Sequence, residues 1–233
     1  MAKEIKYINK DITSIKGLEF SDVRSSNGYC CPLLTADNVK AVNEHVISQS
    51  LFFSGAVERL IGKYFKEHCG DVSPQTVCKK VIMIDAVAST KLDQKLGKGW
   101  FEIAAKRIID LDLESVIKNG NRLGGLFKAL ADIPTVTDSD GTKEELFAFF
   151  SQYIAKVNRY SYNRRDYCIA DTVITKNLRH FSSDLTDIER LILSFRYDEY
   201  CDAFKAFVKS LPNVTEEMIC NFILFTFSEG SDI

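Results

Sequence analysis

A carboxylate placed where a helix begins is the feature of this chain best suited to chemistry. Asp171 ends a short apolar run, residues 167–170, and a helical pattern of apolar residues follows it at once. Gln152 lies nineteen positions upstream in another apolar helical segment, and a loop rich in Arg and Tyr separates the two. This arrangement predicts an acid at the mouth of a helical cleft that Gln152 also faces. A plain helix cap fits the same pattern, because Asp is among the best N-cap residues.

Helical spacing of apolar residues runs through almost the whole chain and predicts an all-α fold. Ser73-Pro74 marks a helix start, because Pro is favoured at the first helical position. Weak strand signals are confined to residues 3–8 and 135–137. Two pairs have the spacing of capping boxes, namely Thr142 with Glu145 and Thr186 with Glu189.

We expect one all-α domain over residues 1–233 with roughly ten helices. Its core-like segment is 74–181, and N-terminal helices within 35–70 and C-terminal helices within 186–228 are expected to pack on that segment. At 233 residues, the chain is long enough to bury a sizeable core. The loop between 137 and 141 is the clearest surface turn.

Composition excludes several classes of protein. With 45% hydrophobic and 27% charged residues, the chain has the make-up of an ordinary globular protein. No apolar run approaches the roughly 18 residues that a membrane span requires, and the first residues lack the apolar core of a signal peptide. Seven scattered cysteines without a C-x-x-C pair favour a reducing compartment. We therefore expect a cytoplasmic protein with no membrane partner, no metal and no cofactor.

Charge is unevenly distributed, although the net charge is only −2. Residues 79–107 hold seven basic against three acidic residues, and residues 151–180 hold six against two. Such stretches can attract phosphates locally, but solvated helix faces give the same distribution. The candidate phosphate-binding residues of the second stretch are Lys156, Arg159, Arg164, Arg165 and Lys176.

Three blocks of sequence carry a family resemblance. They are Val77-Cys-Lys-Lys-Val-Ile-Met-Ile-Asp-Ala-Val-Ala-Ser-Thr90, then Ile103-Ala-Ala-Lys-Arg-Ile-Ile-Asp-Leu111 with Lys118-Asn-Gly-Asn121, and finally Phe149-Phe-Ser-Gln-Tyr-Ile154 with Tyr167-Cys-Ile-Ala-Asp-Thr-Val173. Their order and spacing over residues 74–181 resemble those of a divergent group within the helix–hairpin–helix DNA glycosylase superfamily. The resemblance implies an all-α core and a DNA partner.

The same resemblance implies an enzyme of DNA repair that hydrolyses the N-glycosidic bond of a base swung out of the duplex. Asp171 matches the aspartate that starts a helix in that superfamily, where a carboxylate stabilises an oxocarbenium-like sugar. Gln152 stands where bifunctional members keep a Schiff-base lysine, so the implied activity is monofunctional, without strand cleavage. The implied base pocket is lined by Asp85, Trp100, Tyr153 and Tyr167.

Departures from the family pattern keep a second class of function open. Asp140-Gly-Thr-Lys143 replaces the glycine-rich hairpin, and Asp85 stands where the group has asparagine. The alternative is a catalytically silent all-α module that binds DNA or protein. Trp100 also fits a core position, because it lies on an apolar helix face. The apolar C-terminal segment 218–225 fits either a contact with a protein partner or second copy, or burial in the chain's own core.

Overall fold

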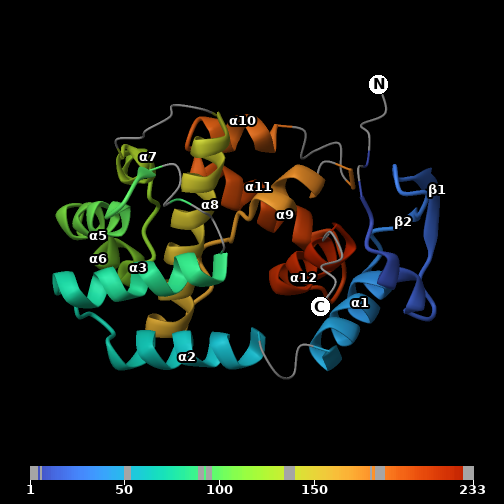
Figure 1. The fold of residues 1–233 in the computed structure, drawn as a ribbon, viewed down its shortest axis with the longest axis horizontal. Helices are drawn as coiled ribbons and strands as arrows, with labels where there is room; N and C mark the ends of the chain where they lie inside the picture. Colours follow the sequence, from blue (N-terminus) through green and yellow to red (C-terminus); the bar gives the residue numbers. More distant parts are fainter. Residues whose placement is uncertain are drawn as a thin grey trace. The chain divides into compact units, whose positions relative to one another are not determined.

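The computed structural model describes residues 5, 7–49, 54–88, 92, 96–133, 140–178, 180–181 and 187–227. Among these residues helices dominate, and the one sheet they form has two strands, so the predicted all-α class is confirmed (Figure 1). The chain divides into two compact units. Unit 1 is drawn from residues 1–53, 173–187 and 203–233, and unit 2 from residues 54–172 and 188–202. This division was not expected from the sequence. The predicted core-like segment 74–181 lies in unit 2 up to residue 172, and its remaining residues belong to unit 1.

Unit 2 is a set of helices gathered around one long helix, α8 (Asp140–Lys156). The others are α2 (Ser54–Glu67), α3 (Pro74–Ala88), α5 (Trp100–Asp110), α6 (Leu113–Asn119), α7 (Gly125–Ala131), the π-helical turn η2 (Val157–Ser161), α10 (Ile188–Leu193) and the first part of α11 (Tyr197–Lys209). Helices α3, α7 and α10 pack against α8, and η2 continues it (Figure 1).

The central position of α8 follows from its sequence. Every residue from 146 to 158 is buried, as expected of a helix that is apolar around its whole circumference. Its polar side chains are therefore removed from water and need partners inside the protein. Gln152 and Lys156 are both among them, with exposed fractions of 7% and 6%.

Helix starts were predicted with mixed success. The start of α3 at Pro74 is confirmed, and the Ser73 hydroxyl accepts a hydrogen bond from the Thr76 amide at 3.4 Å. The predicted cap at Thr142 is wrong, because α8 begins at Asp140 and Thr142 lies buried inside the first turn. The second capping box depends on Thr186, which lies outside the described residues.

Unit 1 contains the two strands, β1 (Phe20–Arg24) and β2 (Cys30–Pro32), which pair antiparallel. Neither strand was predicted. The turn between them depends on Gly28, whose φ of +84° suits glycine. Of the strand signals in the sequence, residues 135–137 lie outside the described part, and the described residues of 3–8 belong to no strand.

The helices of unit 1 are the 3-10 turn η1 (Lys10–Ser14), α1 (Ala36–Gln49), α9 (Thr172–Leu178) beyond its first residue, the end of α11, and α12 (Glu216–Phe227). Helix α12 packs on α1 and fully buries Ile219, Phe222 and Ile223. These residues of the apolar C-terminal segment therefore lie in the core of unit 1. In the described part of the chain, no helix combines the length and the apolar character that crossing a bilayer requires.

Candidate functional site

Buried tyrosines of α11 fix the segment that leads to Asp171. The hydroxyl of Tyr197 donates to the carbonyl oxygen of Cys168 at 2.7 Å, and that of Tyr200 donates to Ile169 at 2.8 Å. Both rings are buried, and a spacing of three residues puts them on one face of the helix. Burial, followed by the nearby cysteines, raises the pKa of Tyr197 well above its ordinary value, so this hydroxyl stays a donor.

Helix α8 holds the same segment at its last residue, Ala170. The Ala170 amide donates to the Ser151 hydroxyl oxygen at 2.9 Å, and that hydroxyl donates to the Ala148 carbonyl at 2.8 Å. This hydrogen bond places the chain at Ser151 beside the chain at Ala170. Gln152 and Asp171 are the residues that follow them. Gln152 is buried, whereas Asp171 is half-buried. The cleft expected between these two residues stays a prediction.

Lys156, the nearest amine to the expected lysine position, is engaged inside unit 2. Its ammonium group forms an ion pair with Glu58 of α2, and the Tyr160 hydroxyl donates to the same carboxylate at 2.6 Å. Burial raises the pKa of Glu58, but the charge and hydrogen bond of Lys156, with the bond from Tyr160, outweigh that effect and lower the pKa overall. The ion pair ties α2 to the end of α8.

A second charged cluster lies deep in unit 2, between α3, α6 and α8. The Lys80 ammonium contacts both oxygens of Glu114, at 2.7 and 2.9 Å, and the Tyr153 hydroxyl donates to Glu114 at 2.8 Å. All three side chains are at most 2% exposed. Burial, together with the Glu114 charge, raises the pKa of Tyr153 well above its ordinary value. Tyr153 is thus a core residue with its hydroxyl already in use.

Two residues with predicted roles in DNA binding hold the turn after α6. They are Tyr167, predicted to line the base pocket, and Arg164, predicted to bind phosphate. The Tyr167 hydroxyl donates to the Asn121 carbonyl at 2.6 Å, and the Arg164 guanidinium donates to the Lys118 carbonyl at 3.0 Å. Arg164 also packs directly over Gly120, where a side chain would meet it. Both residues therefore contribute to the local structure.

The remaining base-pocket candidates lie on α3 and α5. Trp100 is 3% exposed and packs edge-on against Phe149, with ring centroids 5.1 Å apart. It occupies the core position that its apolar helix face also predicted. Asp85 is half-buried on α3.

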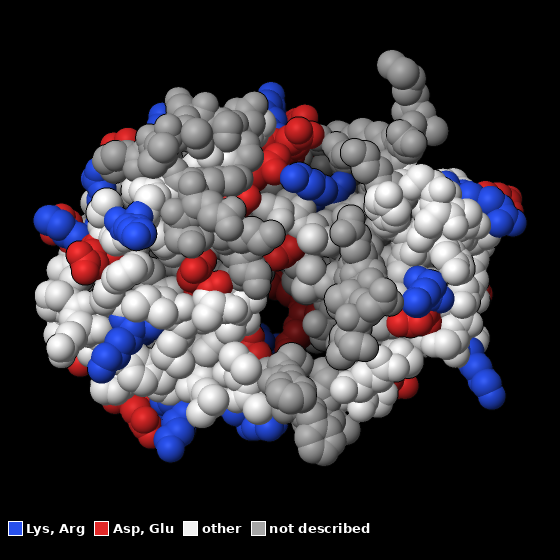
Figure 2. Space-filling model, viewed as in Figure 1, with Lys and Arg blue, Asp and Glu red and all other residues white. Residues whose placement is uncertain are grey.

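The basic residues are largely balanced by acids. Unit 2 carries as many acidic as basic side chains, and Figure 2 shows Lys and Arg in separate spots, several beside acidic groups. Arg164 pairs with Asp166 at 2.6 Å. Arg159 lies half-exposed over the ring of Tyr160, and Arg165 is exposed. Lys176, also exposed, belongs to unit 1. Of the expected phosphate-binding residues in unit 2, Lys156 is therefore buried, Arg159 is half-exposed, and Arg164 and Arg165 are exposed.

No group of His, Cys, Asp and Glu among the described residues is arranged to hold a metal ion. Comparisons with protein-family models, with curated proteins and with solved structures found no match. The resemblance to glycosylases therefore rests on the three sequence blocks alone. The sequence analysis did not predict that Ser151, Tyr197 and Tyr200 hold the segment before Asp171. For the two tyrosines, their close spacing with Cys201 was a signal in the sequence.

Proposed function

We propose that the chain is a monofunctional N-glycosidic hydrolase that acts on a base in DNA, with Asp171 as its catalytic carboxylate. The fixation of residues 168–170 by three buried hydroxyl groups carries the proposal. Catalytic groups work when the surrounding residues hold them to within about 0.5 Å of the productive geometry. Asp171 is half-buried and directly follows this constrained segment, which supports its choice as the catalytic carboxylate.

The proposed reaction needs one carboxylate, and Asp171 supplies it. Cleavage of an N-glycosidic bond passes through an oxocarbenium-like sugar, and one carboxylate can stabilise that charge or activate the attacking water. The base must first leave the stack, which costs a few kcal/mol of unstacking and unpairing. Arg159, Arg164 and Arg165 reach the surface of unit 2, and we propose that they contact phosphates beside such a base.

Strand cleavage is not part of the proposed activity. The Gln152 amide is no nucleophile, and the Lys156 amine is 6% exposed and already paired with Glu58. An amine buried in this ion pair is not available to attack C1′ of the sugar, so we expect no Schiff base. We assign this repair activity to the cytoplasm, since all seven cysteines are free thiols, which fits a reducing compartment.

The test is release of free base from a panel of duplexes that carry damaged, mismatched and modified bases. We expect an abasic site in an intact strand, which breaks only after alkali treatment. The panel should include every common deaminated, oxidised and alkylated base. No release from any member would contradict the proposed activity.

A second candidate function is a catalytically silent binding module. It is favoured by the burial of Trp100, Tyr153 and Tyr167, because three of the four expected pocket residues then lie in the interior. The equal numbers of acidic and basic side chains in unit 2 favour a protein over DNA as its partner. An absence of both base release and duplex binding at low salt would select this candidate.

A further inference from the structure

A pocket of about 670 Å³ opens in unit 2 between α7, the beginning of α8 and the residues that follow α10. Its volume lies within the range of roughly 300–1,000 Å³ that small-molecule sites occupy. It shares no residue with the Asp171 segment or with the buried ion pairs. The described residues that line it are Gly125, Lys128, Ala129, Ala131, Asp132, Ile133, Thr142, Lys143, Leu146 and Phe195.

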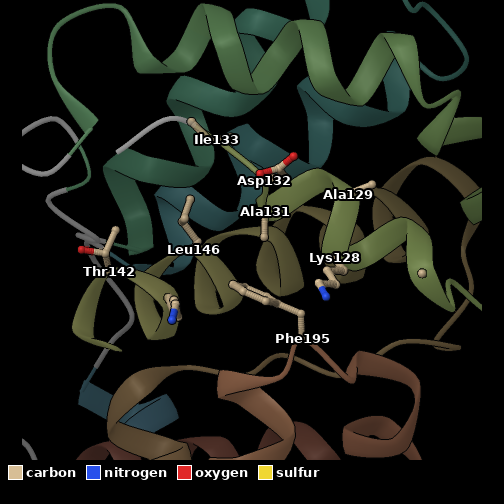
Figure 3. Close-up of a pocket in the computed structure, with 10 residues that line it drawn as sticks. Lys128, Ala129, Ala131, Asp132, Ile133, Thr142, Leu146 and Phe195 are labelled. Atoms are coloured by element: carbon tan, nitrogen blue, oxygen red, sulfur yellow. The ribbon is translucent and has the colours of Figure 1, made fainter. Parts of the chain in front are cut away.

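One side of this pocket is apolar. Ala131, Ile133 and Leu146 are all less than 10% exposed, and their aliphatic groups form a continuous part of the lining. In Figure 3 the Phe195 ring extends from the opposite side toward Leu146 and Ala131. An apolar body of a ligand would be removed from water between these side chains, which is favourable in proportion to its area.

The charge at the pocket is positive. Lys128 lines the pocket, is exposed, and takes part in no ion pair among the described residues; Lys143 supplies a second amine nearby. The one acid of the lining, Asp132, lies 3.8 Å from the Arg107 guanidinium, which also donates to the Asp132 carbonyl at 2.7 Å. Figure 3 shows the Asp132 carboxylate turned away from the Phe195 ring. Among the residues that the structure describes, Lys128 therefore lines the pocket without an ion-pair partner.

Phe195 has a strained backbone at this position. The Phe195 amide donates a hydrogen bond to the Ile192 carbonyl at 3.0 Å, and the Arg196 amide donates to the Leu191 carbonyl at 2.8 Å. These two bonds form the Schellman motif that ends α10. The central residue of this motif is left-handed, and Phe195 has a φ of +53°. Glycine would adopt that conformation without the roughly 1–2 kcal/mol that a side chain costs. The Phe195 ring packs near those of Phe127 and Phe147, with centroid distances of 6.5 and 6.3 Å. Backbone strain of this kind is common at ligand sites.

We propose that this pocket binds a small amphipathic carboxylate, with the apolar chain against Leu146 and Phe195 and the carboxylate at Lys128. The inference is independent of the proposed glycosylase activity, because no residue is shared. The lining gives the two halves of the ligand different partners, so a neutral molecule with the same chain should bind less tightly.

Octanoate is the probe, and octanol is its neutral counterpart. Isothermal titration calorimetry should detect octanoate binding that is at least fivefold tighter than octanol binding. Lys128→Met should lower octanoate affinity about fivefold to tenfold and leave octanol affinity unchanged. The matched control is Lys118→Met, which removes an exposed lysine from α6 outside the pocket and should change neither affinity.

A second variant tests the apolar side of the pocket. Gly125 lies in the lining, its φ is not in the left-handed region, and a Cβ added there meets nothing within 4 Å. Gly125→Leu should therefore fill part of the pocket without unfolding the chain and abolish binding of both probes. Undetectable octanoate binding to the wild type would overturn the proposal, as would equal affinity for the two probes or unchanged binding in both variants.

Discussion

The hydroxyl of Tyr200 donates to the carbonyl oxygen of Ile169 at 2.8 Å, two residues before Asp171. A side chain of α11 thereby fixes the backbone that leads to the candidate catalytic carboxylate. Tyr197 does the same one residue earlier, at Cys168. Buried carbonyl groups outside regular structure need such partners, because an unpaired one is costly. The same contacts serve folding and the position of the site.

Replacing Tyr200 by Phe removes this donor from the part-buried Ile169 carbonyl. We expect a loss of about 1–3 kcal/mol in the free energy of unfolding, the usual cost of such a group. Urea unfolding measures it. Tyr7→Phe, at a residue that is 52% exposed, is the control and should be neutral. A neutral Tyr200→Phe would show that water replaces the hydroxyl and that the segment is not held by it.

In the cluster of Lys80, Glu114 and Tyr153, we expect the loss of one member to destabilise the protein more than the loss of all three. Glu114→Leu leaves the Lys80 ammonium buried without its counter-ion and should cost about 3–5 kcal/mol. The triple variant Lys80→Met, Glu114→Leu, Tyr153→Phe removes all the polar groups together and should recover most of that loss. Chemical denaturation of the single and triple variants compares them. A triple variant no more stable than Glu114→Leu would contradict the electrostatic explanation.

The ion pair of Glu58 with Lys156 predicts a pH dependence. The pKa of Glu58 is lowered in the folded protein from its ordinary value of 4.5. The stabilisation is therefore fully present above about pH 4.5 and is lost as the pH falls through the lower folded-state pKa. The stability difference between wild type and Glu58→Gln should be constant at neutral pH and shrink toward pH 3. Asp37→Asn, at a side chain that is 96% exposed, serves as control. A difference that persists unchanged at pH 3 would contradict the role of the carboxylate charge.

The contact of Arg164 with Gly120 can be separated from backbone strain by two glycine variants. Gly120 and Gly70 have positive φ values of +66° and +75°, but only at Gly120 would a Cβ meet the Arg164 guanidinium. Both alanine variants should lose about 1–2 kcal/mol through the left-handed backbone, and Gly120→Ala should lose more. In the Arg164→Ala background, the further change Gly120→Ala should show no such excess in thermal unfolding. Equal losses at the two glycines would show that Arg164 gives way freely.

Sequence patterns predicted the helices better than the site. The start of α3 was readable because Ser73 and Pro74 are local signals, and the burial of α8 followed from its composition. The prediction that Thr142 caps α8 was wrong, because the same spacing of Thr and Glu also occurs within the first turn of a helix. Tyr197 and Tyr200 lie far along the chain from the carbonyl groups they bind. Periodicity indicates which face of a helix is buried, but it does not indicate which distant backbone group accepts a hydrogen bond there.

Base release by the Asp171→Asn variant tests the proposed catalytic role most directly. On a substrate from which the wild type releases a base, we expect this variant to lose release while keeping its affinity for DNA, because the change removes the charge and preserves the shape. Asp37→Asn should keep full activity, and borohydride should trap no covalent complex with the wild type. Full activity in Asp171→Asn would show that the carboxylate is only a helix cap, and a trapped complex would show that an amine such as Lys156 attacks the sugar.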